Sequence, residues 1–147
     1  MTLDLNSFTS QSATTCHEFV IRTYVPVEDV DKTLQAIAEV TPLRYGSYEN
    51  VAFQSAAGTQ KFRPLSGSHL GSASKVFDFP VVELVFAIPH DEELLKATVD
   101  KIFAVHIAEE PVIYINESWS TRARDYSDIA NPNRFWNRPD FNDENSW

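Results

Sequence analysis

Two copies of a strand-then-helix pattern, each interrupted by a proline at the same place, constrain the fold of this chain most. Residues 18–25 are rich in β-forming side chains and end at Pro26, and residues 81–88 repeat the pattern and end at Pro89. Proline cannot donate to a sheet ladder but suits the first turn of a helix. Acidic residues follow both prolines, as the positive end of a helix favours. The repeat therefore indicates a duplicated βαβ unit.

Each unit also needs a helix and a returning strand. Apolar residues recur at helical spacing after both prolines. Residues 48–55 alternate between apolar and polar side chains, which predicts a strand, and residues 56–58 predict a hairpin into a strand at 59–63. Residues 111–117 predict the last strand. The order βαβ-β-βαβ predicts an α+β ferredoxin-like sandwich, in which an antiparallel sheet carries both helices on one face.

The composition argues against several classes of partner. The chain has 147 residues and a net charge of −9, and a phosphate backbone would instead favour a concentrated basic face. Nucleic acid is therefore not expected. No apolar run approaches the ~20 residues that cross a bilayer, and the polar residues 1–15 do not form a signal peptide. Cys16 is the only cysteine, which fits a reducing compartment and an inert thiol. We expect a cytoplasmic protein without a membrane partner.

Changes in composition divide the chain into three segments. We expect a flexible lead at 1–16, a folded domain at 17–118 and an irregular arm at 119–147. The arm holds all three tryptophans, Trp119, Trp136 and Trp147. Disordered tails are poor in aromatic residues because they bury nothing. We therefore expect the arm to pack its rings on the sheet or on a neighbouring subunit.

Three motifs occur in an order that resembles one known family. They are Tyr45-Gly46-Ser47-Tyr48-Glu49-Asn50-Val51-Ala52-Phe53; Gly58-Thr59 with Phe62-Arg63-Pro64-Leu65 and Gly67-Ser68; and His106 with Glu109-Glu110-Pro111. Together they resemble the PII/CutA-like domain of the YqfO (Nif-three-like) proteins, over about residues 17–118. The aromatic arm would then be a C-terminal extension of a standalone domain.

The resemblance implies a PII/CutA-like sandwich, often assembled as a homo-oligomer and most often as a trimer. In the larger family members this domain is inserted between two lobes that build a dinuclear metal site. The paired histidine motifs of those lobes do not occur in this sequence, so the resemblance does not imply that metal chemistry. Ile107-Ala108 also stand where the family usually has Pro-Tyr.

The stretch from Gly58 to Gly71 predicts a shaped loop that lines a cleft, because it carries three of the four glycines. Lys61 and Arg63 share a strand face if Phe62 turns to the core. They can then hold a carboxylate or phosphate, and His69 can add to the same anion site. The ligand-binding candidates are therefore Lys61, Arg63 and His69. The alternatives are a charged, solvated edge strand and a solvated loop histidine.

A second candidate site lies at the end of the second helix. His106, Glu109 and Glu110 are close enough in sequence to share a divalent metal ion, the one cofactor considered. The alternative is that His106 caps the helix, whose negative end favours it. His90 precedes acidic residues at a helix start, and we interpret it as local capping.

Three hypotheses about function follow. The favoured one is an oligomeric small-ligand-binding or sensing domain of PII/CutA type without catalytic activity. The second is a small lyase, isomerase or cyclase with an apolar cavity that the arm closes. Its acid, base and anchoring candidates are Tyr48, Arg63, His69 and His106. The third is a divalent-metal binder that uses the corner at His106.

Overall fold

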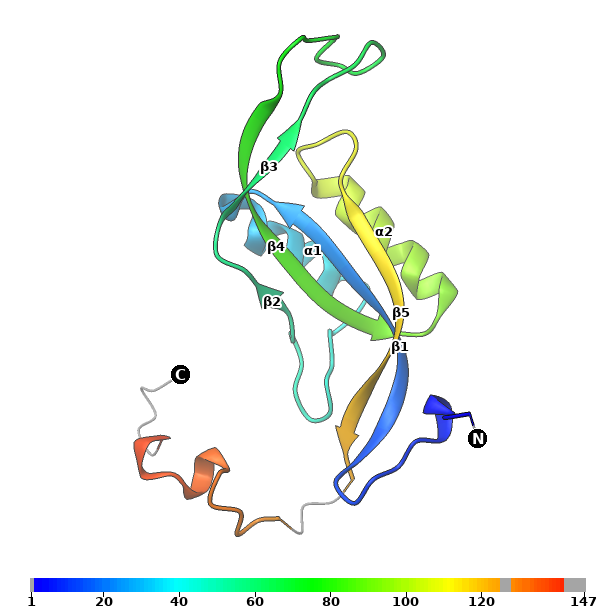
Figure 1. The fold of residues 1–147 in the computed structure, drawn as a ribbon, viewed down its shortest axis with the longest axis vertical. Coiled ribbons are helices and arrows are strands. Elements are labelled where there is room, and N and C mark those ends of the chain that lie inside the picture. The colour runs from blue at the N-terminus through cyan, green and yellow to red at the C-terminus, as the bar shows by residue number, and fades with distance from the viewer. Residues whose placement is uncertain (1, 125–127, 142–147) are drawn as a thin grey trace.

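The computed structural model describes residues 2–124 and 128–141 (Figure 1). Its strands and α-helices are β1 (Ala13–Val25), α1 (Val30–Ala38), β2 (Phe53–Gln54), β3 (Gly58–Phe62), β4 (Phe77–Pro89), α2 (Glu92–Val105) and β5 (Ile113–Ala123). The short 3-10 turns are η1 (Leu5–Ser7), η2 (Val27–Asp29), η3 (Phe135–Asn137) and η4 (Pro139–Phe141). No helix within these described ranges is both long and apolar enough to span a bilayer.

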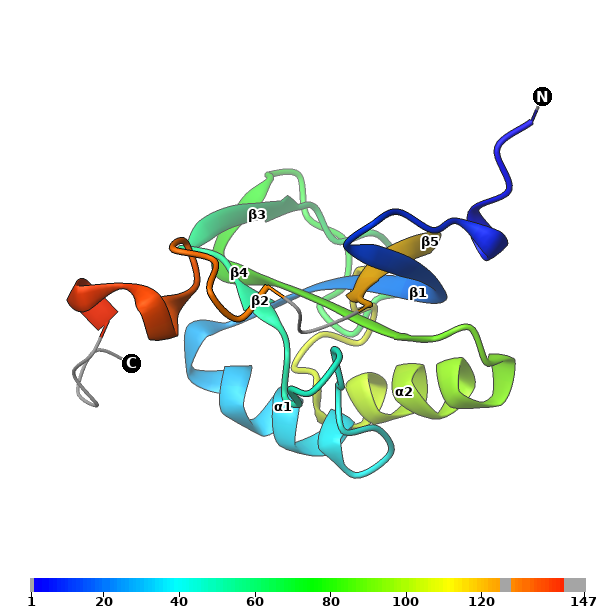
Figure 2. The same ribbon diagram turned by 90° about the horizontal axis from the view of Figure 1, so that it is seen from below.

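The strands form one antiparallel sheet in the order β2-β4-β1-β5, with β3 also paired to β4. The central strand β1 places Ile21 opposite Phe86 of β4 and opposite Ile115 of β5. Both helices cover the same face of the sheet (Figure 2). This arrangement is the predicted α+β ferredoxin-like sandwich.

The core lies between the sheet and the two helices. Ile21, Ile37 and Ile102, from β1, α1 and α2, have no exposed surface, and Phe86 and Ile88 of β4 pack with them. Successive strand residues point to opposite faces, so every second residue of β1 and β4 enters this layer. The other face of the sheet carries no helix, and Phe53 and Tyr114 are exposed there.

The first and last strands are longer than predicted. β1 begins at Ala13 and β5 ends at Ala123, and these two residues pair with each other. Both expected boundaries, at 16/17 and 118/119, therefore lie inside paired strands. The prediction of the first strand was too short because residues 13–16 contain no large apolar side chain. Their threonines nevertheless suit a strand once β5 supplies the hydrogen bonds.

The predicted strand at 48–55 and the hairpin after it were wrong. Only Phe53–Gln54 pair as β2, because Asn50 has a φ of 57°, which a strand does not adopt. β2 and β3 do not pair with each other. Both lie against β4, β2 at Leu84 and Val85 and β3 at residues 77–81. Residues 55–57 thus connect two successive strands that run in the same direction along β4, and they do not form a hairpin turn.

Phe62 does not enter the core, contrary to the prediction. It is 40% exposed and stacks on Phe77 across the hairpin, with ring centroids 5.7 Å apart. The β3–β4 hairpin extends past the two helices (Figure 1), so no helix covers either of its faces.

The described hydrogen bonds of residues 128–141 join this segment to itself. Trp136 Nε1 donates to the Ile129 carbonyl, and the Asn137 side-chain amide donates to the carbonyls of Ile129 and Asn131. Trp119, which was expected in the arm, belongs to β5. Trp147 lies outside the described residues.

Candidate functional site

Two histidines and a glutamate lie together at the end of the sheet where β4 runs into α2. His17 belongs to β1 and Glu117 to β5, and His90 directly follows β4. Their ligand atoms all lie within 4.8 Å of one another. In the part of the chain that the structure describes, this is the one group of three His, Cys, Asp or Glu side chains so placed. We refer to these three residues as the His–Glu cluster.

Strand register assembles the His–Glu cluster. Glu18 pairs with Pro89, so the next residue of the β4 chain, His90, lies beside His17, and its N–H donates to the His17 carbonyl at 3.2 Å. On the other side His17 pairs with Trp119 of β5. Glu117 lies two residues before Trp119 and shares its face of the sheet.

One carboxylate oxygen of the cluster faces both imidazoles. Glu117 Oε1 contacts His17 Nε2 and lies 3.2 Å from His90 Nε2. The side chains of His17, His90 and Glu117 are 28%, 39% and 52% exposed. The three donor atoms therefore converge at a place that solvent can reach.

The two imidazoles belong to a column of four stacked rings. The His17 ring lies between Trp119, with centroids 4.4 Å apart, and His90, with centroids 3.8 Å apart. The other face of His90 lies on Phe19, with centroids 4.3 Å apart. Trp119 Nε1 donates to Asn6 Oδ1 at 2.9 Å, which ties the column to the segment before β1.

The donor set has a defined chemical preference. Two imidazole nitrogens and one carboxylate oxygen suit Zn²⁺, Cu²⁺ or Ni²⁺, whereas Mg²⁺ and Ca²⁺ prefer oxygen ligands alone. Three protein ligands also leave a coordination position for water or a small molecule. The cluster can thus hold a divalent transition metal.

The sequence interpretation missed this cluster. It assigned His90 to helix capping, but Asp91 caps α2 by accepting from the Leu94 N–H at 3.1 Å. A usable signal was present in the predicted strand bounds, because His17 directly precedes the predicted strand at 18–25, His90 follows the one at 81–88 and Glu117 ends the one at 111–117. In an antiparallel sheet the start of one strand lies beside the ends of its neighbours.

The predicted metal corner has a different geometry. The His106 Nε2–H donates to the Tyr24 carbonyl at 2.7 Å, and its Nδ1 accepts from the Ala108 N–H at 2.9 Å. Both ring nitrogens are therefore engaged at the C-terminal end of α2. Glu109 turns instead to His69, so His106, Glu109 and Glu110 are not among the donor groups found in the described residues.

The contact between His69 and Glu109 joins two distant segments. The His69 N–H donates to Glu109 Oε1 at 2.9 Å, and its Nδ1 contacts Oε2. This ties the loop at 64–76 to the turn between α2 and β5. The hydrogen bond and charge of Glu109 raise the pKa of His69, and the hydrogen bonds from His69 lower the pKa of Glu109.

These shifts predict a pH window for the loop contact. A raised His69 pKa means that the contact is fully formed below the ordinary value of 6.5 and is lost as pH rises through the raised value. A lowered Glu109 pKa means that it is lost as pH falls through a value below 4.5. NMR titration should therefore give His69 a midpoint above 6.5 in the wild type and a lower one in Glu109→Gln. Glu110→Gln is the matched control and should leave the midpoint unchanged. Equal midpoints in wild type and Glu109→Gln would contradict the contact.

Lys61 and Arg63 both have partners within the β3–β4 hairpin and its loop. Lys61 Nζ lies 2.7 Å from Asp78 Oδ1 on the paired strand, and both side chains are exposed. One guanidinium nitrogen of Arg63 donates to the Ala73 carbonyl at 3.3 Å. This geometry fits the alternative of a charged edge strand.

A shallow groove of about 430 Å³ lies beside Lys61 on the face of the sheet that carries no helix. Tyr24 and Glu83 line it, and the Tyr24 hydroxyl donates to Glu83 Oε2 at 2.7 Å. This hydrogen bond to a carboxylate raises the pKa of Tyr24. Tyr114 also lines the groove, with its ring edge-on to Tyr24.

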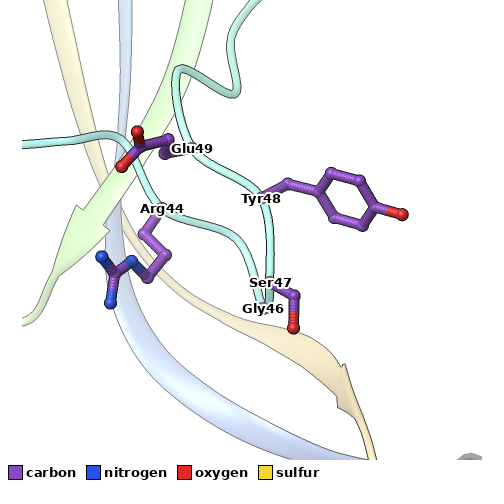
Figure 3. A pocket seen from close by; sticks show the side chains of 5 residues that line it. All are labelled: Arg44, Gly46, Ser47, Tyr48 and Glu49. Atoms are coloured by element: carbon purple, nitrogen blue, oxygen red, sulfur yellow. The ribbon is translucent and has the colours of Figure 1, made fainter.

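Tyr48 lies in a separate depression in the loop between α1 and β2. Its side chain is 67% exposed and points away from Arg44 and Glu49 (Figure 3). This loop and the loop at 64–76 lie at opposite ends of the sheet (Figure 1). The structure thus does not gather Tyr48, Arg63, His69 and His106 into one site.

Comparison with known proteins gives relatives in fold. No known family and no curated protein matches the sequence. A Bacillus cereus protein related to NIF3 matches 76% of this chain with a TM-score of 0.59 and 18% identity, and this chain spans only 27% of it.

Two CutA1 proteins are also similar. The divalent ion tolerance protein CutA1 from Ehrlichia chaffeensis has a TM-score of 0.50 and 14% identity, with 74% of this chain and 84% of that chain covered. CutA1 from a psychrotrophic Shewanella species has a TM-score of 0.51 and 12% identity, with coverages of 67% and 78%. At these identities the likeness extends to the fold and no further.

Proposed function

We propose that this protein is a non-catalytic sensing domain that binds one divalent transition-metal ion through His17, His90 and Glu117. The observation that carries the proposal is the convergence of two imidazole nitrogens and one carboxylate oxygen within 4.8 Å. Neutral imidazole nitrogens and a carboxylate oxygen are the usual protein ligands of such ions. The name of the Ehrlichia CutA1, a divalent ion tolerance protein, supports the same class of ligand.

The surroundings of the enzyme candidates support a binding role over catalysis. A general acid or base must reach the proton that it transfers, together with the other reacting groups. Both ring nitrogens of His106 are hydrogen-bonded within the protein. His69 contacts Glu109, and Arg63 donates to the Ala73 carbonyl, so both residues hold the loop at 64–76 in place. Tyr48 belongs to the loop between α1 and β2, which lies at the other end of the sheet from that loop (Figure 1). These four residues therefore do not form one catalytic arrangement.

The motifs at residues 45–53, 58–68 and 106–111 support placing the chain beside the PII/CutA-like domain of YqfO proteins, as does the similarity in fold to the NIF3-related protein. The single cysteine, Cys16, supports a reducing compartment such as the cytoplasm.

The chain is also proposed to self-associate through the face of the sheet that carries no helix. Phe53 and Tyr114 are more than half exposed on that face, and no helix in the described part of the same chain covers them. Sedimentation velocity should give a particle heavier than the 16.7 kDa chain. Tyr114→Lys should shift it toward the monomer, and Phe103→Lys, which replaces an exposed aromatic residue of α2, is the control. A wild-type monomer at high concentration would contradict self-association.

Calorimetric titration of the metal-free protein tests the metal proposal directly. We expect one Zn²⁺, Cu²⁺ or Ni²⁺ ion to bind per chain, and Mg²⁺ and Ca²⁺ to bind far more weakly, because the ligand set contains nitrogen. Equal affinity for Zn²⁺ and Mg²⁺, or no binding of Zn²⁺, would refute the proposed function.

A further inference from the structure

The orientation of the two imidazoles restricts how the His–Glu cluster can take up an ion. The His17 and His90 rings are stacked, with planes inclined by only 12° and centroids 3.8 Å apart. An imidazole binds a metal through a lone pair in the plane of its ring, at about 2.0–2.1 Å from nitrogen. Two nearly parallel planes that lie one above the other share no point at that distance. One ion therefore cannot bind both rings while they remain stacked.

We infer that metal binding unstacks the His90 ring from His17 and Phe19. The ion can then be coordinated only after this stacking is lost. This inference rests on the proposed metal function. It adds that the stacking of the four rings stabilises the metal-free conformation and so lowers the affinity for the metal ion.

His90 is the ring that moves. It follows the last residue of β4, outside any strand, whereas His17 lies within β1 and pairs with Trp119 of β5. The His90 side chain is also the more exposed of the two, at 39% against 28%. His90 directly precedes Asp91, the N-terminal cap of α2.

Two substitutions test which of the two imidazole rings moves when the ion binds. Among the described residues, Phe19 stacks on His90 and not on His17, and Trp119 stacks on His17 and not on His90. Phe19→Leu removes a stack that the ion must break, so the Zn²⁺ affinity should rise roughly two- to tenfold, the range that one aromatic pair represents. Trp119→Leu removes a stack that survives binding, so the affinity should stay within about twofold of the wild type.

A measurement on the wild-type protein covers the case in which Phe19→Leu folds poorly. Zn²⁺ is diamagnetic, so the His90 ring protons can be followed by NMR as the ion is added. In the metal-free protein they lie against the rings of His17 and Phe19, and we expect their NOEs to the Phe19 ring to be lost on binding.

The outcomes distinguish the two proposals. Zn²⁺ binding in which the His90 ring keeps its NOEs to Phe19, or a larger gain in affinity for Trp119→Leu than for Phe19→Leu, overturns the unstacking of His90 and leaves the metal function standing. Failure of the wild type to bind Zn²⁺ overturns both. Tighter binding by Phe19→Leu together with loss of the NOEs between His90 and Phe19 supports the unstacking of His90.

Discussion

His90→Ala is expected to weaken Zn²⁺ binding by more than about 100-fold, and His17→Ala by a similar factor. Loss of an outer partner that only orients a ligand already reduces metal affinity by about 10- to 100-fold, so loss of a ligand should exceed that range. Both imidazoles face the same oxygen of Glu117, and neither has a substitute nearby among the described donor groups. Calorimetric titration of each variant gives the affinity.

His69→Ala is the matched control, because it also removes one imidazole from an exposed position. His69 contacts Glu109 and takes no part in the cluster, so Zn²⁺ affinity should be that of the wild type. Glu117→Gln should give an intermediate loss, since the amide keeps an oxygen and removes the charge. If His69→Ala weakens binding as much as His90→Ala does, the ion lies elsewhere on the protein.

Arg122→Ala is expected to destabilise the fold by about 3 kcal/mol, because it leaves a buried carboxylate without its cation. Glu18 is only 4% exposed, and its two oxygens contact the Arg122 guanidinium and the Ser120 hydroxyl. The guanidinium also lies 3.6 Å from the centre of the Tyr45 ring. Urea denaturation followed by circular dichroism gives the free energy of unfolding.

Two further variants show whether the burial of charge is the cause. Arg124→Ala removes an exposed arginine of the same strand end, which donates to the Ser10 carbonyl, and should cost about 1 kcal/mol or less. Glu18→Leu combined with Arg122→Leu removes both charges and should return the stability to within about 1–2 kcal/mol of the wild type. A cost for Arg122→Ala no larger than that for Arg124→Ala would contradict this account.

This ion pair also supports the candidate metal site. Glu18 directly follows His17 in β1 and points to the opposite face of the strand. Arg122 lies three residues after Trp119 in β5, so the ion pair fastens the two strands that carry His17 and Trp119. The position of the ring column thus depends on a buried charge pair behind it.

The sheet edge is where sequence interpretation failed most clearly. The alternation at residues 48–55 is that of a strand, yet only Phe53 and Gln54 pair, because Asn50 adopts a positive φ. Local alternation cannot report which strand a segment lies against. Phe62 was placed in the core by the same reasoning and is exposed, because no helix covers the β3–β4 hairpin.

The amino-acid sequence by itself determined the order of the elements, the two proline junctions and the ferredoxin-like class. Those features depend on short-range periodicity and on the backbone limits of proline. Only the tertiary structure decided which polar side chains meet. His17 and Glu117 are 100 residues apart and come together through strand register, a long-range pairing that sets each side chain opposite its partner. The sequence predicted a metal site at the corner of His106, whereas strand register assembles the candidate metal site at the other end of the sheet.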